Sequence, residues 1–133
     1  MLTDQVVADG SLRSVPAGAA FDVRIPWYRS LPYSCVEGLD VAIDGRRIDS
    51  GLLRMELGGE EYLLSELAPL HDRWWYVADA AAVTVPLAEP LAAGAHELDV
   101  TIHMRIPYIV ESDVPLVMRE RCVKTQTAQG ASL

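Results

Sequence analysis

The fold is decided by the stretch His96-Glu97-Leu98-Asp99-Val100-Thr101-Ile102-His103-Met104-Arg105-Ile106, in which polar and apolar residues alternate from Glu97 onward. Because successive side chains of an extended chain point to opposite faces, this period of two gives one apolar face and one polar face. The pattern predicts an antiparallel strand that packs one face on a core and leaves the other face in water.

Shorter segments on both sides of this strand are joined by turn sequences. The dipeptide Asp44-Gly45 separates the run 39–43 from 46–49, and Gly58-Gly59 separates 53–57 from 60–64. Dipeptides of these types favour two-residue hairpin turns. Further strands are predicted at 21–25, 74–77, 83–87 and 116–124, and helical candidates of one or two turns at 65–70 and 79–82.

This order of strands and turns predicts an all-β fold, an antiparallel β-sandwich of about eight short strands. The length of 133 residues suits a single domain, 1–133, with a core that needs no crosslinks. The N-terminal segment 1–16 and the small polar tail 125–133 are predicted to be mobile ends.

The charge and the cysteine content limit the partners and the compartment. A formal net charge of −8 repels nucleic-acid phosphates and anionic lipid, so neither partner is expected. The sequence shows no signal-peptide pattern and no apolar run long enough to span a bilayer, which predicts a cytoplasmic protein. Cys35 and Cys122 are then expected as reduced thiols, with a disulfide between them as the alternative.

The sequence offers no combination of residues that is typical of a catalytic or metal site. His71, His96 and His103 do not form the closely spaced pairs of metal ligands. The triplet 71–73, His-Asp-Arg, has the residue types of an acid–base pair, but neighbours on an extended chain point apart, which favours a solvated loop. Cys35 has no nearby base and is expected to be buried. We therefore predict no catalytic residue, no metal ligand and no cofactor bound by this chain.

Aromatic residues gather beside prolines rather than in the alternating strands. Three of them lie in the segment Pro26-Trp27-Tyr28-Arg29-Ser30-Leu31-Pro32-Tyr33. The hexapeptide 23–28, Val-Arg-Ile-Pro-Trp-Tyr, is similar to 104–109, Met-Arg-Ile-Pro-Tyr-Ile. Because proline interrupts strand pairing, both strands are predicted to end there and to deliver aromatic loops to one end of the sandwich. The alternative is that both copies are only a common way of ending a strand.

These aromatic loops are the candidate functional surface. Trp and Tyr on a stiff loop lose little conformational entropy when they contact a partner. Within 74–76, Trp-Trp-Tyr, alternation is expected to place Trp74 and Tyr76 in the core and Trp75 at the surface. We predict a partner interface or active-site lid formed by Trp27, Tyr28, Arg29, Tyr33, Trp75 and Tyr108.

Four segments together resemble the small β subunit of bacterial C-glycoside deglycosidases: 24–32, 34–41, 74–76 and 105–108. The similarity extends over about 15–125. The resemblance implies a carbon–carbon lyase complex that cleaves the C–C bond between a 3-keto sugar and an aromatic aglycone of flavonoid type. It also implies a large α subunit with a TIM-barrel fold, which holds a divalent metal (manganese or similar) and the acid–base residues.

For this chain, the resemblance implies an accessory β-sandwich subunit that is inactive alone and forms a hetero-oligomer with the α subunit. Its small-molecule substrate, a C-glycoside, would be bound by the complex as a whole. The residues themselves leave a second function open, a stand-alone β-sandwich module that binds a carbohydrate or an aglycone on the aromatic loops. A third, an independent enzyme, finds no support in the candidate residues.

Overall fold

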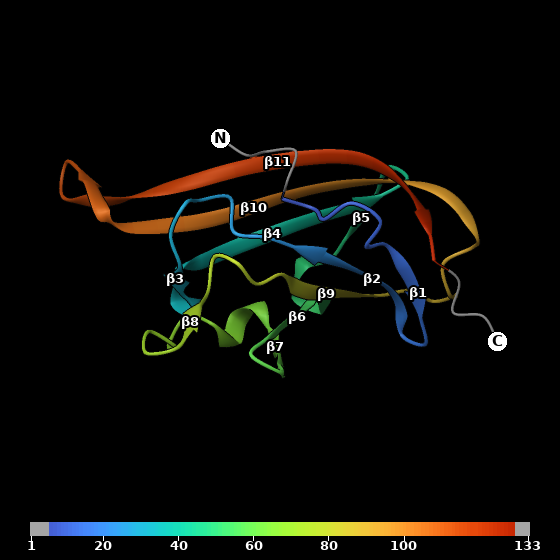
Figure 1. The fold of residues 1–133 in the computed structure, drawn as a ribbon, viewed down its shortest axis with the longest axis horizontal. Coiled ribbons are helices and arrows are strands. Elements are labelled where there is room, and N and C mark those ends of the chain that lie inside the picture. Colours follow the sequence, from blue (N-terminus) through green and yellow to red (C-terminus); the bar gives the residue numbers. More distant parts are fainter. Residues whose placement is uncertain (1–5, 130–133) are drawn as a thin grey trace.

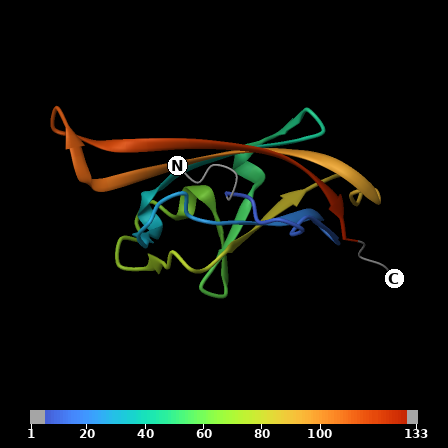
Figure 2. The same cartoon turned by 45° about the horizontal axis from the view of Figure 1, so that its top comes forward.

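Two antiparallel sheets pack face to face in the computed structural model, which describes residues 6–129 (Figure 1, Figure 2). Apolar side chains from both sheets form one core between them. The first sheet has the order β1-β2-β9-β6-β7, formed by Arg13–Val15, Gly18–Val23, Ala81–Pro86, Arg54–Leu57 and Glu60–Leu63. The second has the order β11-β10-β4-β5, formed by Val114–Ala128, Gly94–Glu111, Val36–Ile43 and Arg46–Ile48. The predicted all-β sandwich is confirmed.

Within residues 6–129, a short strand pair and three 3-10 turns complete the fold. β3 (Leu31–Pro32) pairs with β8 (Trp74–Trp75) at the end of the molecule where the β10–β11 hairpin projects (Figure 1). The 3-10 turns are η2 (Tyr33–Cys35), η3 (Ser50–Leu52) and η4 (Leu64–Glu66). The helix predicted at 65–70 is reduced to η4, and the one predicted at 79–82 is wrong because β9 begins at Ala81. Within residues 6–129, no helix has the length and apolar character needed to cross a membrane.

β10 is the strand that the alternating pattern predicted, and it lies between β4 and β11. Burial of an aliphatic side chain contributes roughly 1.5–3 kcal/mol each, so this strand is a main source of core stability. Its inward residues are fully buried: Leu98, Val100, Ile102, Met104 and Ile106.

Both predicted hairpin turns are confirmed. Asp44 and Gly45, between β4 and β5, have φ angles of 52° and 80°. Gly58 and Gly59, between β6 and β7, have φ angles of 61° and 85°. Two successive residues with positive φ match the twist of the strands in a tight hairpin. Asp-Gly and Gly-Gly adopt positive φ readily, which explains why they predict hairpin turns well.

The strands are more numerous, and two of them much longer, than predicted: residues 6–129 form eleven strands, of which β10 has 18 residues and β11 has 15. Pro107 does not end β10. The register with β11 shifts between Ile106 and Val110, so the proline lies in a bulge. Pro115 pairs with Val110 inside the hairpin. β4 pairs with β10 no further than Met104, so the missing N–H of Pro107 interrupts one ladder only.

The described parts of the two predicted mobile ends pack against the rest of the sandwich. Val6, Val7 and Leu12 are buried, and β11 continues to Ala128. The buried Gln126 joins the two ends, because its side-chain oxygen accepts from Leu12 N at 3.0 Å and its amide nitrogen donates to Ala8 O at 2.9 Å. The parts of the predicted mobile ends at 1–5 and 130–133 lie outside the described residues.

Candidate functional site

Four of the six predicted surface residues meet at one end of the sandwich, and we call Trp27, Tyr28, Arg29 and Tyr108 the aromatic cluster. The indole N–H of Trp27 donates a hydrogen bond to the hydroxyl of Tyr108. The ring centroids of Trp27 and Tyr28 lie 4.9 Å apart, with the rings tilted by 43°. The guanidinium carbon of Arg29 lies 5.6 Å from the ring centroids of both Tyr28 and Tyr108. The two proline segments therefore deliver their aromatic residues to the same place.

The aromatic cluster is largely exposed yet internally restrained, with Trp27 partly buried against the core. Tyr28 is 61% exposed and Tyr108 is 48% exposed. Contacts between a cation and a ring at exposed sites contribute about 0.5–1 kcal/mol each, which limits ring motion without burying the rings. β2 ends at Val23, and Ile25 is buried just before Pro26, so the segment is anchored where it leaves the sheet. Such a surface contacts another molecule at a low cost in side-chain entropy.

The other two predicted residues, Tyr33 and Trp75, belong to the core, and their assignment to the surface is wrong. Trp75 is 2% exposed, lies opposite the buried Leu31 across the β3–β8 pair, and donates its indole N–H to the carbonyl oxygen of Asp79 at 2.8 Å. Tyr33 is 6% exposed, and its ring meets the ring of Tyr62 edge-on at a centroid distance of 5.9 Å.

Trp74 and Tyr76 are surface residues instead, the reverse of the predicted alternation. They are 47% and 61% exposed. Because β8 has only two residues, residues 74–76 contain no repeat from which the inward face could be recognised. The following residues lie beside the first proline segment, since Val77 N donates to Ser30 Oγ at 2.8 Å and Arg24 donates to Ala78 O at 3.3 Å.

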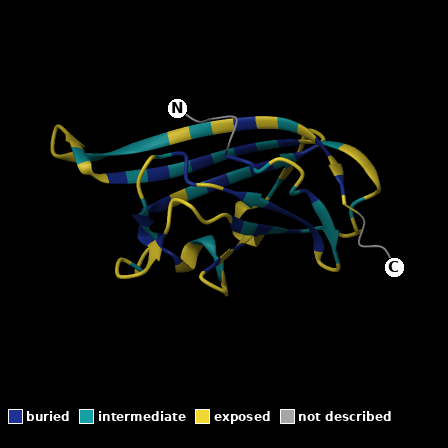
Figure 3. Cartoon of the chain, in the orientation of Figure 1, coloured by how far each residue is buried: buried dark blue, intermediate teal, exposed yellow. Residues whose placement is uncertain are grey.

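The β10–β11 hairpin extends this end of the molecule beyond the two-sheet body (Figure 1, Figure 3). Its tip, residues 107–116, turns at Ser112 and Asp113, which have φ angles of 49° and 64°. Val110 and Val114 on the tip are 54% and 61% exposed. Together with the aromatic cluster, the hairpin tip forms an exposed apolar surface that we call the end surface.

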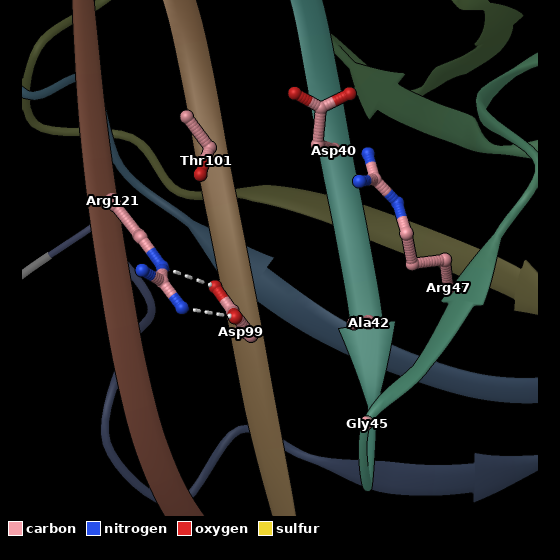
Figure 4. Close-up of a pocket in the computed structure, with 7 residues that line it drawn as sticks. All are labelled: Asp40, Ala42, Gly45, Arg47, Asp99, Thr101 and Arg121. Atoms are coloured by element: carbon pink, nitrogen blue, oxygen red, sulfur yellow. Dashed lines mark hydrogen bonds and ion pairs between the residues drawn. The ribbon is translucent and has the colours of Figure 1, made fainter.

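The outer face of the second sheet is polar and contains an open hollow of about 350 Å³ (Figure 4). Arg121 donates two hydrogen bonds to Asp99, at 2.9 and 2.7 Å. These bonds, the charge of Arg121 and the charge of Arg47 hold the pKa of Asp99 below its usual value. Asp40 lines the same hollow, so two carboxylates face two guanidinium groups. Their charges balance, and the hollow attracts neither anions nor cations strongly.

Several of the titratable residues that could perform chemistry are engaged in structural contacts or buried. His96 lies 2.6 Å from a carboxylate oxygen of Asp44, and His103 lies 2.8 Å from one of Asp40. Cys35 and Cys122 are buried free thiols, and burial raises the pKa of Cys35. In the predicted solvated triplet, Arg73 donates to the hydroxyl of Tyr62 at 2.8 Å. Over residues 6–129, no three His, Cys, Asp or Glu side chains are grouped so that they could hold a metal ion.

Known proteins that are similar to this chain agree on one family. The profile of the C-glycoside deglycosidase beta subunit family matches residues 2–108. A C-glycoside deglycosidase beta subunit from Microbacterium trichothecenolyticum is 38% identical over 132 residues, which are 98% of this chain and 100% of that protein. A 3'-dehydrocarminate deglycosidase beta subunit from a Microbacterium species is 40% identical over 90% of both chains. A C-glycoside deglycosidase beta subunit from Arthrobacter globiformis is 32% identical over 94% of this chain and 95% of its own length.

Proposed function

The chain belongs to the C-glycoside deglycosidase beta subunit family and is one subunit of an enzyme complex, and we propose that it is the non-catalytic subunit that binds the α subunit through its end surface. The observation that carries this proposal is the aromatic cluster. Trp27 and Tyr108 come from segments far apart in the sequence and are joined by a side-chain hydrogen bond, with Arg29 between two exposed tyrosine rings.

The proposed reaction of the complex is cleavage of the C–C bond between a 3-keto sugar and an aromatic aglycone of flavonoid type. A ketone acidifies the neighbouring C–H bonds, so a base can remove a proton and the aglycone can leave by elimination. We assign the base and acid to a TIM-barrel α subunit. The support from this chain is that His96 and His103 are both held by carboxylates in the sheet framework.

We also assign the divalent metal, manganese or similar, to the α subunit. Residues 6–129 do not fit such an ion, because no three of their His, Cys, Asp or Glu side chains lie together so that they could hold a metal. The part of this chain in the reaction is therefore to bind and order the α subunit. Exposed aromatic residues in a restrained arrangement are the residue types that dominate the binding energy of protein interfaces.

The double variant Trp27→Ala/Tyr28→Ala tests this proposal in the complex formed with the α subunit. Its affinity for the α subunit, measured by calorimetry, should fall about tenfold or more, as expected for central aromatic anchors. Deglycosidase turnover at fixed subunit concentrations should fall with it. Leu52→Ala is the control, because Leu52 is 53% exposed in η3, away from the end surface. Unchanged affinity and turnover in the double variant would contradict the proposal.

Activity assays of the separate subunits test the non-catalytic role. The chain alone should give no product from a 3-keto C-glycoside, and addition of the α subunit should restore cleavage. Turnover by the purified chain alone would show that it carries catalytic residues of its own. Of the two functions predicted from the sequence, the subunit names of the relatives favour the accessory subunit over a stand-alone module.

A further inference from the structure

A second feature of the same end is a small open cavity beside the exposed rings of Trp74 and Tyr76. It has a volume of about 190 Å³. Its walls come from β8, from the segment that follows it, and from the β6–β7 turn. A cavity of this size accommodates a single ring rather than a whole glycoside, since pockets for drug-sized ligands are of roughly 300–1,000 Å³. The lining residues are Tyr33, Glu56, Leu57, Gly58, Trp74, Trp75, Tyr76, Asp79 and Ala80.

Tyr33 brings its hydroxyl to this cavity. The residue is 94% buried, at 6% exposure, and its hydroxyl has no hydrogen-bond partner among residues 6–129. The oxygen lies 2.8 Å from the position that a Cβ on Gly58 would occupy, so the absence of a side chain there keeps it accessible. Because the described residues contain no buried side-chain oxygen or nitrogen that lacks a partner, this hydroxyl is open to solvent at the cavity, and a ligand oxygen can accept a hydrogen bond from it.

Carboxylates and aromatic rings supply the remaining contacts. Glu56 and Asp79 line the cavity and are exposed. The segment that carries Asp79 is fixed, because its carbonyl oxygen accepts from Trp75 Nε1 at 2.8 Å and its N–H donates to Tyr76 O at 2.9 Å. Two carboxylates disfavour an anionic ligand and accept hydrogen bonds from hydroxyl groups. Trp and Tyr rings offer flat apolar faces for stacking.

We propose that this cavity binds one neutral ring that carries hydroxyl groups, with an apolar face against Trp74 and Tyr76 and its hydroxyls toward Tyr33, Glu56 and Asp79. Sugars and phenols share this chemistry. The inference goes beyond the proposed docking role, because it requires no α subunit.

Titration of the full-length chain, labelled with ¹⁵N, with methyl β-glucopyranoside or with phenol tests the proposal and separates the two sources. Saturable shifts of the Trp74 indole N–H signal are expected with at least one probe. Affinity for that probe should fall about fivefold in Tyr33→Phe, which removes a single hydrogen bond. It should fall further in Tyr76→Ala, which removes a stacking surface.

Tyr28→Ala is the matched control, since Tyr28 and Tyr76 are both 61% exposed but Tyr28 lies outside the cavity. Its affinity for the probe should equal that of the wild type. The Trp75 indole signal, which reports the bond to Asp79, shows whether each variant keeps its fold. Shifts that do not saturate with either probe, or equal losses in Tyr28→Ala and Tyr76→Ala, would overturn the proposal. Because the α subunit is absent, neither result depends on subunit docking.

Discussion

The indole N–H of Trp27 donates to the hydroxyl of Tyr108, 81 residues later in the chain, and this bond joins the two proline segments at one end of the sandwich. Neither residue lies in the buried core. A side-chain hydrogen bond at an exposed site contributes only about 0.5–1.5 kcal/mol, so its importance lies in orientation rather than stability. It holds the rings of Trp27 and Tyr108 in a fixed relative orientation within the end surface.

The hairpin tip should contribute to subunit binding without contributing to folding. Val114→Asp places a charge on a side chain that is 61% exposed, so the urea midpoint of the chain should change little. Affinity for the α subunit should fall at least tenfold, because a buried unpaired charge is costly at an interface. Val123→Asp is the matched control: Val123 is 48% exposed on the same hairpin, but far from its tip. Equal losses in both variants would exclude a specific role for the tip.

The two neighbouring tryptophans should differ sharply in their effect on stability. Trp75→Ala removes a buried ring and its bond to Asp79 and should lower the free energy of unfolding by about 3–5 kcal/mol. Trp74→Ala removes a ring that is about half exposed and should cost under about 1 kcal/mol. Urea denaturation followed by circular dichroism measures both. A larger cost for Trp74→Ala would mean that the β3–β8 register is shifted by one residue.

Gln126 should be a strong determinant of stability because it joins both chain ends. Gln126→Ala leaves Leu12 N without its partner, whereas Ala8 O still accepts from Ser11. A buried unsatisfied group costs about 1–3 kcal/mol, and we expect a loss of that size in the free energy of unfolding. Thr125→Ala, at an exposed position on the same strand, should change it by less than about 0.5 kcal/mol. Similar losses in the two variants would argue against the buried amide as the cause.

The contact between His96 and Asp44 should make stability depend on pH in both directions. The hydrogen bond to Asp44 and the bond to Ala92 O raise the pKa of His96 above 6.5. The stability gained from protonated His96 is therefore full below pH about 6.5 and is lost as the pH rises through the folded pKa. Bonds from His96 and from Glu97 N lower the pKa of Asp44 below 3.8, so its contribution is present above that value and is lost as the pH falls through the folded pKa.

The difference in unfolding free energy between the wild type and His96→Gln should thus be largest near pH about 5–6 and smaller at pH about 9. Urea titrations across this range measure it. Thr125→Ala, which removes no titratable group from an exposed position, is the control and should show a flat difference. A difference for His96→Gln that grows toward high pH would contradict the assigned sign.

The sequence by itself determined the fold class and most of the aromatic cluster. The alternation in β10 identifies its inward face because five apolar residues repeat the same period, and Asp44-Gly45 and Gly58-Gly59 specify hairpins through positive φ angles. The positions of Trp27, Tyr28, Arg29 and Tyr108 beside prolines indicated a surface, and the resemblance indicated the family that the relatives confirm.

Only the tertiary structure decided the positions of Tyr33, Trp74, Trp75 and Tyr76. A strand of two residues has no period, and a shift of one residue exchanges its two faces, so the partner strand β3 selects which ring is buried. The same holds for Pro107, whose effect depends on whether a neighbouring strand needs its N–H. The pairing of β10 with β4 stops at Met104, so β4 does not need the N–H that Pro107 lacks. Gln126 is buried because the two ends of the chain meet around it. Its hydrogen bond with Leu12 N spans 114 residues, so no local sequence pattern predicts it.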